Sequence, residues 1–212
     1  IITNKDTSFN PLWIMRQAGR YLPEFREIRR KNPDFINLCL NDNLSVEITL
    51  QPLKRFDIDA AIIFSDILML PYGLGQKVKF EKNFGPKLDS IDLNEIAKLD
   101  EIDFVEKIYP VYKAIKKVSS DIIVKDKNTI GFIGAPWTLL VYMINLKSPK
   151  KELNTDFFKD DFLINRILLI IEKFLKVHIK NQIDNGANVI QIFDSWAGLL
   201  EEKDLPNYIY TP

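Results

Sequence analysis

Three short runs of mainly apolar residues constrain the fold of this chain more than any other feature. They lie at 59–64, 129–133 and 188–193, and each is followed by polar or turn-forming residues. Short runs that stay apolar from one position to the next, instead of alternating, are typical of strands buried on both faces of a parallel sheet. The sequence therefore predicts three such strands.

Helical patterns of apolar residues separate the three predicted strands. Helices are predicted over 24–30, 44–56, 103–118 and 162–183. We expect Ser45 to cap the second of these helices, and Asn185-Gly186 to end the last one. A further short strand is expected over 77–80, where polar and apolar residues alternate. Buried strands that alternate with helices indicate an α/β protein with a parallel sheet.

The composition argues against nucleic acid and membranes as partners. The 212 residues include 29 Lys and Arg and 29 Asp and Glu, so the formal net charge is zero. Nucleic-acid-binding surfaces usually carry an excess of basic charge, so we expect no nucleic-acid partner. No apolar run has the length of a membrane-spanning helix, and we expect no membrane association. The single cysteine, Cys39, has no intrachain disulfide partner, which fits a reducing compartment.

The organisation of the chain points to a single domain over 1–212. No internal repeat, low-complexity tract or long linker divides it. The N-terminal residues do not form a signal peptide. Because the sequence begins without Met, we expect further residues upstream, including any targeting segment.

Two arginines mark the most distinctive stretch of the chain, residues 13–26. Arg16 and Arg20 stand four residues apart among apolar and aromatic neighbours, with Gly19 between them and Pro23 just beyond. The glycine and proline favour an ordered loop that leads into a helix. A guanidinium donates two parallel hydrogen bonds to a carboxylate or phosphate and keeps its charge at any working pH. The alternative is that both arginines form structural ion pairs or are only solvated.

The segment 13–26 closely resembles the N-terminal signature of the uroporphyrinogen decarboxylase family, whose members remove carboxyl groups from the four acetate arms of a cyclic tetrapyrrole. Three other stretches resemble further signatures of the family, in the same order along the chain: 64–68, 131–143 and 191–198. In the last stretch Ser195 matches. Asp194 stands where the family commonly has Glu, and Trp196 where it often has His.

The resemblance implies a fold and an assembly. The family folds as a (β/α)8 TIM barrel, which normally needs about 250 residues, and three strands do not close a barrel. We therefore expect this chain to be the N-terminal part, covering roughly the first three βα units, with the C-terminal part beyond residue 212. The resemblance also implies a homodimer. The expected location is the cytoplasm, with a plastid as the alternative.

The end of the first predicted strand carries the residue most suited to chemistry, Asp66. A lone Asp at such a place is more often a helix cap or turn former. In the family, however, this aspartate accepts hydrogen bonds from the pyrrole N–H groups of the substrate. Loss of CO2 needs an electron sink, which protonation of the pyrrole provides as a cationic intermediate. A fixed carboxylate stabilises that developing positive charge, so the resemblance implies no metal and no cofactor.

Further site residues follow from the resemblance and from the position of strand ends, where active sites of parallel α/β folds lie. Arg16 and Arg20 are expected to bind substrate carboxylates, and Arg16 is also expected to relay a proton. Tyr142 and Ser195 are expected to hydrogen-bond the substrate, or alternatively to pack without such a role. The other expected binding residues are Gln17, which offers a polar contact, and Phe193, which lines the apolar floor.

Two alternatives to a uroporphyrinogen decarboxylase stay open. The first is a barrel methyltransferase of the same superfamily, which uses zinc with a corrinoid or folate methyl donor. Zinc needs several Cys or His ligands, whereas this chain has only Cys39 and His178, and His178 is expected on a helix face. The second alternative is a non-catalytic tetrapyrrole-binding relative.

Overall fold

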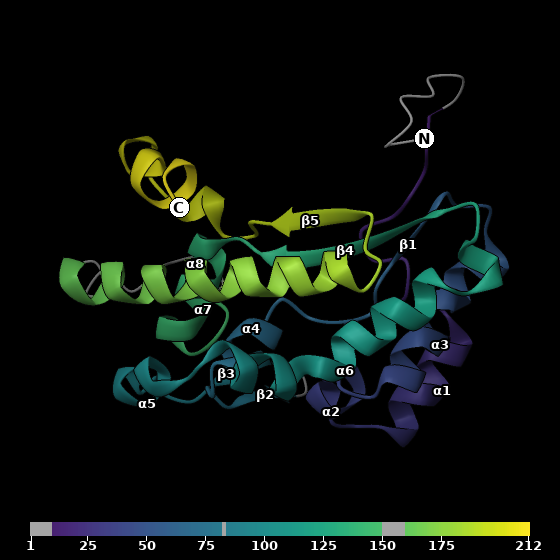
Figure 1. Cartoon of the computed structure of the whole chain (residues 1–212), viewed down its shortest axis with the longest axis horizontal. Coiled ribbons are helices and arrows are strands. Elements are labelled where there is room, and N and C mark those ends of the chain that lie inside the picture. Colours follow the sequence, from purple (N-terminus) through teal and green to yellow (C-terminus); the bar gives the residue numbers. More distant parts are fainter. Residues whose placement is uncertain (1–9, 82–83, 150–159) are drawn as a thin grey trace. The chain divides into compact units, whose positions relative to one another are not determined.

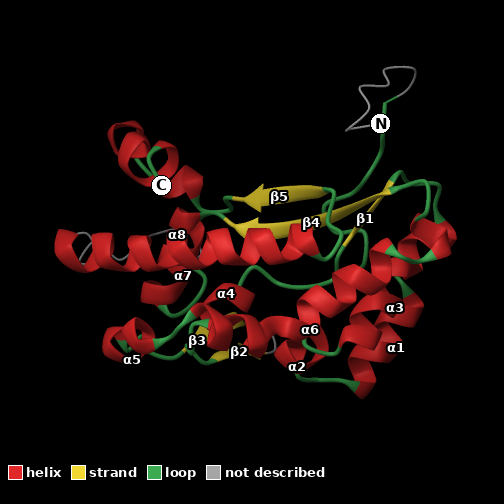
Figure 2. Cartoon of the chain, viewed as in Figure 1, coloured by secondary structure: helices red, strands yellow, loops and turns green. Residues whose placement is uncertain are grey.

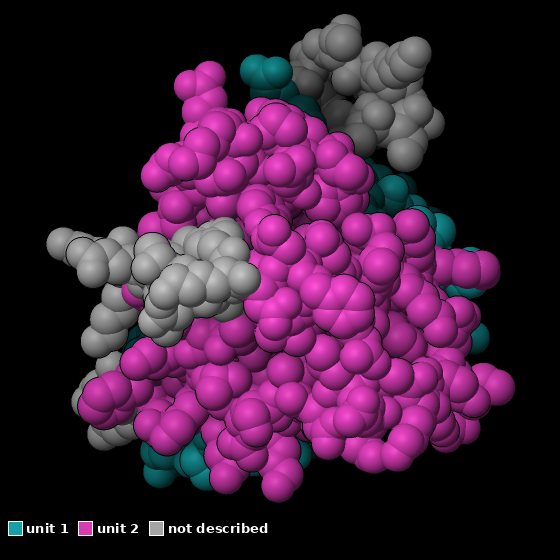
Figure 3. Space-filling view, turned by 90° about the vertical axis from the view of Figure 1, so that its left-hand side faces the viewer, with its two compact units in different colours: residues 1–65, 110–132, 181–191 teal, residues 66–109, 133–180, 192–212 magenta. Residues whose placement is uncertain are grey.

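The computed structural model describes residues 10–81, 84–149 and 160–212 (Figure 1). These residues divide into two compact units, coloured separately in Figure 3. The first unit comprises the described residues up to 65 together with 110–132 and 181–191. The second comprises the described residues of 66–109, 133–180 and 192–212.

Three neighbouring strands form one sheet, in the order β1 (Ala60–Ile62), β4 (Asn128–Gly134) and β5 (Val189–Phe193). β1 and β4 are parallel, with Ala60 opposite Asn128. Figure 2 shows the three strands side by side, and the arrow of β5 points the same way as that of β4. The three strands predicted from the apolar runs, and the mixed α/β class, are confirmed. The prediction that all three are buried on both faces was wrong for β5, which is only partly buried, with Ile192 55% exposed.

Three helices of the first unit pack around an apolar cluster. They are α1 (Pro23–Lys31), α2 (Phe35–Cys39) and α3 (Asp42–Arg55), seen together in Figure 1. The cluster is built from large side chains of α1 to α3 and of the residue before α1: Leu22, Phe25, Ile28, Leu38 and Ile48. Phe64, which follows β1, meets the rings of Phe25 and Phe35 edge-on. These contacts connect α1 and α2 to the segment that ends β1.

The prediction that Ser45 caps a helix was wrong. α3 begins at Asp42, three residues before Ser45. The side chain of Asn41 accepts the capping hydrogen bond from the backbone N–H of Leu44. Asn is as good an N-cap as Ser, so the local sequence offered both positions. Ser45 is instead buried inside the helix, where its hydroxyl donates to the carbonyl of Phe64.

The second unit contains several shorter elements that begin after β1. Its elements are α4 (Met69–Gly73), the antiparallel pair β2 (Val78–Glu81) and β3 (Gly85–Leu88), α5 (Leu93–Lys98), α7 (Pro136–Asn145) and short turns of helix at Ala197–Leu199, Glu202–Asp204 and Pro206–Tyr210. The short strand predicted over 77–80 is thus confirmed as β2. The helix at α7 was not predicted from the sequence.

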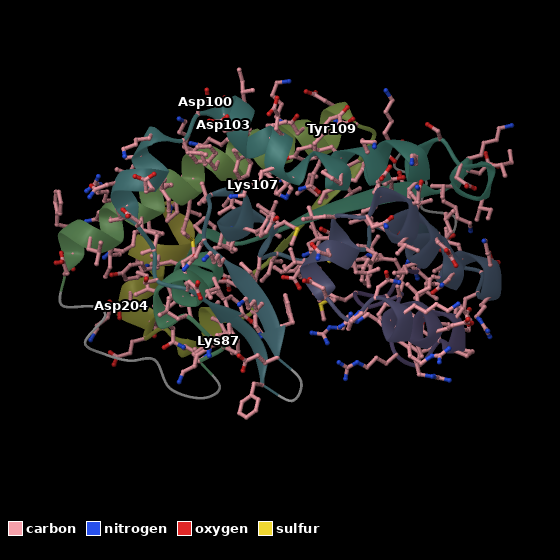
Figure 4. The ribbon with its side chains drawn as sticks, turned by 90° about the horizontal axis from the view of Figure 1, so that it is seen from below. Lys87, Asp100, Asp103, Lys107, Tyr109 and Asp204 are labelled. Atoms are coloured by element: carbon pink, nitrogen blue, oxygen red, sulfur yellow. The ribbon has the colours of Figure 1, made fainter. Side chains whose placement is uncertain are left out.

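Two long helices run from one unit into the other. α6 (Glu101–Ser119) and α8 (Asp161–Asp184) lie close to the bounds predicted for them, and a turn of 3-10 helix (Ile122–Val124) follows α6. Figure 4 shows polar side chains at the start of α6, where Asp100 accepts a hydrogen bond from the backbone N–H of Asp103. Of the apolar residues of α6 that lie in the second unit, Phe104 and Ile108 are fully buried, whereas Ile102 is 67% exposed.

His178 lies in the core of the second unit, on the buried face of α8. It is only 5% exposed and meets the ring of Phe104 edge-on. Burial disfavours the charged imidazolium and lowers the pKa of His178 to about 4, from an ordinary value of 6.5. This position matches the expectation of a helix-face residue.

The stability of the protein should therefore fall as the pH is lowered from about 6.5 to about 4. In that window the unfolded chain binds a proton at His178 and the folded chain does not, so acid favours unfolding. We expect a loss of about 2 kcal/mol from this group. Urea unfolding at pH 7 and pH 4.5 measures the decline, and His178→Gln, which does not titrate, should show a decline smaller by about that amount. Equal declines in both proteins would contradict the assignment.

Candidate functional site

The arginine segment of the first unit is anchored by Gln17. This side chain is 2% exposed, its Nε2 donates to the carbonyl of Ala60 at 3.0 Å, and its Oε1 accepts from the backbone N–H of Ile14 at 3.0 Å. The hydroxyl of Tyr21 donates to the carbonyl of Gln17. The nitrogen of the Gln17 side-chain amide thus holds the segment against the first residue of β1, and its oxygen binds within the segment.

Arg16 and Arg20 are exposed on this anchored segment. Within 10–81, 84–149 and 160–212, neither guanidinium has a hydrogen bond or an ion pair. Neighbouring arginines differ: Arg55 binds both oxygens of Glu24, at 2.6 and 2.9 Å, and Arg26 donates to two backbone carbonyls. The structural ion pairs considered for Arg16 and Arg20 are therefore not formed with the described residues.

Apolar side chains surround the two arginines on the same segment. Each is more than half exposed: Leu12, Ile14, Met15 and Tyr21, at 52 to 56%. Exposed apolar residues gathered in one segment are typical of a binding surface. The segment thus offers cationic groups and apolar contacts together.

Asp66 opens the second unit, four residues after β1. Its Oδ1 accepts from the backbone N–H of Leu68 at 2.9 Å, and its carbonyl accepts from the N–H of Met69. This turn leads directly into α4. The turn-forming interpretation of Asp66 is therefore correct, and the same turn fixes the direction of the half-buried carboxylate.

The end of β4 lies against two other segments of the second unit. A Cβ placed on Gly134 meets Cβ of Ile67 at 3.2 Å and Cδ2 of Leu139 at 2.9 Å, so a side chain here would force these neighbours to shift. The N–H of Ala135 donates to the carbonyl of Phe193 at 2.9 Å. The segment after Asp66, the start of α7 and the end of β5 are thereby brought together.

Thr138 connects α7 to the residues that follow β5. Its hydroxyl donates to Oδ1 of Asp194 at 2.6 Å and accepts from the backbone N–H of Trp196 at 3.1 Å. The indole N–H of Trp137 donates to the carbonyl of Trp196 at 2.9 Å. Burial raises the pKa of Asp194, and the hydrogen bond from Thr138 opposes that rise.

The other predicted site residues of the second unit lie around this connection. Tyr142, on α7, is half-buried, and its ring meets that of Trp196 edge-on at 5.9 Å between centroids. Phe193 is half-buried at the end of β5, and Ser195 is exposed between Asp194 and Trp196. The structure therefore brings Tyr142 and the segment 193–196 together. Sequence reasoning gave Thr138 no role, although Pro136 at the first position of α7 signals a helix start.

The described residues offer no ready metal site and no membrane helix. In that part of the chain, no three His, Cys, Asp or Glu side chains are grouped so that they could hold a metal ion. Nor is any helix among them long and apolar enough to cross a membrane.

The family resemblance is confirmed by comparison with known proteins. The model of the uroporphyrinogen decarboxylase (URO-D) family matches residues 1–212. A protein named uroporphyrinogen decarboxylase from Agrobacterium fabrum is 40% identical over 215 residues, which is 100% of this chain and 62% of that protein. Proteins of the same name from Chelativorans sp. and Campylobacter jejuni are each 42% identical, over 95% and 93% of this chain. Both are covered over 59% of their own length.

The chain thus spans about three-fifths of the length of these relatives. Among solved structures, a methyltransferase from Methanosarcina mazei has a similar fold, with a TM-score of 0.68, 17% identity, and coverage of 86% of this chain and 55% of that one. At that identity the likeness concerns the fold alone. The sequence matches decide the family: this chain belongs to the uroporphyrinogen decarboxylase family.

Proposed function

We propose that this chain supplies the N-terminal part of an enzyme that converts uroporphyrinogen to coproporphyrinogen by removing the carboxyl group of each of its four acetate side chains. One observation carries the proposal. Arg16 and Arg20 stand exposed, without a partner among the described residues, beside four exposed apolar side chains. A tetrapyrrole bearing acetates and propionates has the matching character, since its macrocycle is apolar and its arms are carboxylates.

Each predicted site residue has a part in this proposal. Arg16 and Arg20 bind substrate carboxylates, and Arg16 relays a proton near the reacting ring. Tyr142 and Ser195 donate hydrogen bonds to the substrate, and Phe193 lies under the macrocycle. Gln17 contributes by holding the arginine segment, because the oxygen and the nitrogen of its side-chain amide already bind backbone atoms.

In the proposed reaction, the negative charge of Asp66 stabilises a cationic intermediate. A proton added to a pyrrole carbon makes the ring a cationic electron sink. The bond between the acetate CH2 and its carboxylate then breaks, CO2 leaves, and the electron pair neutralises the ring. A second proton then adds to the exposed methylene carbon and gives the methyl group, and the ring carbon releases the first proton, which restores the neutral pyrrole. A carboxylate at hydrogen-bond distance from the pyrrole N–H groups stabilises the cation before CO2 leaves. No step requires a metal or an organic cofactor.

The fold and assembly proposed with this activity are those of the family. The chain covers roughly the first three βα units of a (β/α)8 TIM barrel as part of a single domain. The complete enzyme forms a homodimer and acts in the cytoplasm. The parallel order of β1, β4 and β5, with helices between them in sequence, supports this proposal.

The methyltransferase alternative is less well supported. Its only support is a structural likeness at 17% identity. Zinc sites need three or four Cys, His or carboxylate ligands close together, and the described residues hold no such group.

The activity is tested with the gene product that carries these 212 residues. It is incubated with uroporphyrinogen without oxygen, the products are oxidised, and the carboxyl groups are counted by chromatography. Stepwise loss of four carboxyl groups supports the proposal. Intact substrate that co-purifies with the protein would instead favour the non-catalytic tetrapyrrole-binding relative, and neither turnover nor binding would contradict both.

The two exposed arginines should control substrate affinity. We expect Arg16→Ala and Arg20→Ala each to raise KM for uroporphyrinogen about 10- to 150-fold, because a hydrogen bond to a charged group contributes about 1.5–3 kcal/mol. Arg30→Ala is the matched control, since Arg30 is also exposed in the first unit, and its KM should stay within twofold. Equal KM values in all three variants would show that the segment does not bind the substrate.

A further inference from the structure

The hydroxyl of Thr138 occupies an unusual position for a residue outside the predicted site. The side chain is fully buried in the first turn of α7, and its oxygen takes part in two hydrogen bonds to the segment after β5. The two partners, the Asp194 carboxylate and the Trp196 backbone N–H, stand on either side of Ser195. One hydroxyl thus fixes both neighbours of a predicted substrate-binding residue.

We propose that Thr138 is a positioning residue, which holds segment 193–196 against α7 so that Ser195 and Tyr142 are presented together to the substrate. This inference rests on the proposed decarboxylase function of the site. Thr138 itself need not touch the substrate, because it acts through Asp194 and Trp196.

The neighbouring contacts support a positioning role. Trp137, next to Thr138, donates its indole N–H to the carbonyl of Trp196, so consecutive residues of α7 hold the same segment. The ring of Tyr142, one helical turn further along α7, lies edge-on to the ring of Trp196. The indole Nε1 of Trp196 is buried, and no described residue accepts a hydrogen bond from it. Packing against Tyr142 and the backbone contacts to Thr138 and Trp137 therefore fix the place of Trp196.

The role of Asp194 follows from the same geometry. Its carboxylate oxygen accepts the hydrogen bond from Thr138, and this hydrogen bond needs an acceptor oxygen but no negative charge. An amide at this position offers the same acceptor oxygen without the charge. Asp194→Asn therefore separates positioning from acid–base chemistry.

The test compares three substitutions in the gene product that carries these residues: Thr138→Val, Thr138→Ser and Asp194→Asn. Val keeps the shape and removes the hydroxyl, and we expect kcat/KM for uroporphyrinogen to fall about 10- to 100-fold, since small misplacements of binding groups cost this much. Ser keeps the hydroxyl, and Asn keeps the acceptor, so both should stay within about threefold of wild type. Assays are run well below the unfolding temperature of each variant.

A second measurement does not depend on turnover. Acrylamide quenching of Trp196, taken as the difference between proteins with Trp196 and with Trp196→Phe, should increase at least twofold in Thr138→Val and not in Thr138→Ser. If wild type does not turn over uroporphyrinogen, the proposed function fails, and the quenching still decides whether Thr138 holds the segment.

Two results would overturn the inference. Thr138→Val with unchanged kcat/KM and unchanged quenching would show that the hydroxyl does not position segment 193–196. A large loss of kcat in Asp194→Asn, with unchanged quenching, would show that the charge of Asp194 acts in the chemistry and that Thr138 is not the reason for its place.

Discussion

Replacement of Asp66 by Asn is expected to slow decarboxylation of uroporphyrinogen about 100-fold or more and to leave the fold intact. Two charges about 4 Å apart attract by about 4 kcal/mol at an effective dielectric constant near 20, and each 1.36 kcal/mol of barrier is a factor of ten in rate. Asn keeps a dipole in place of the charge, so part of the interaction survives. The turn also survives, because the amide oxygen can accept from the N–H of Leu68 as Oδ1 does now.

The measurement is kcat for the loss of the first carboxyl group, together with the thermal unfolding midpoint. Asp92→Asn is the matched control, because Asp92 also accepts backbone hydrogen bonds at the start of a helix in the second unit. It should leave kcat unchanged. Asp66→Ala should lose both the rate and some stability, since it also removes the turn contact. A kcat for Asp66→Asn within threefold of wild type would exclude the carboxylate as the stabiliser of the cationic intermediate.

The strands and long helices could be predicted because their buried residues are apolar and recur at regular positions in the sequence. β1, β4 and β5 lie where the apolar runs lie, and α6 and α8 lie where apolar residues recur at helical spacing. The helix α7 was missed because its residues are almost all apolar or buried, so no polar face revealed the period. β3 was missed because Gly85 and Pro86 argue against a strand, and only pairing with β2 makes it one.

The site divides in the same way. The residues expected to meet the substrate, such as Arg16 and Asp66, lie in motifs that are each contiguous in sequence. The contacts that hold these motifs in place join residues far apart in sequence. Gln17 reaches Ala60, 43 residues away, and Thr138 reaches Asp194, 56 residues away. Contacts between residues so far apart in sequence depend on the tertiary fold, and no local sequence pattern predicts them.

Gly131→Ala is expected to lower the free energy of unfolding by about 3 to 4 kcal/mol. Gly131 lies in β4, where an added Cβ would overlap Oε1 of Gln182 and approach Cδ1 of Ile190 to 3.0 Å. Gln182, on α8, is buried and bonds both backbone groups of Phe132, at 2.9 and 3.0 Å. Ala at 131 would push this amide away. The cost combines overpacking, about 1–3 kcal/mol, with buried groups that lose their partners, about 1–3 kcal/mol.

Urea unfolding monitored by circular dichroism measures this loss, and Gly198→Ala is the control. A Cβ at Gly198 meets nothing within 4 Å, so that variant should stay within about 0.5 kcal/mol of wild type. The double variant Gly131→Ala/Gln182→Ala tests the cause. Because both changes act on one contact, its loss should be clearly smaller than the sum of the two single losses. A strictly additive result would mean that Gly131 is required for some reason other than the close approach of the Gln182 amide to β4.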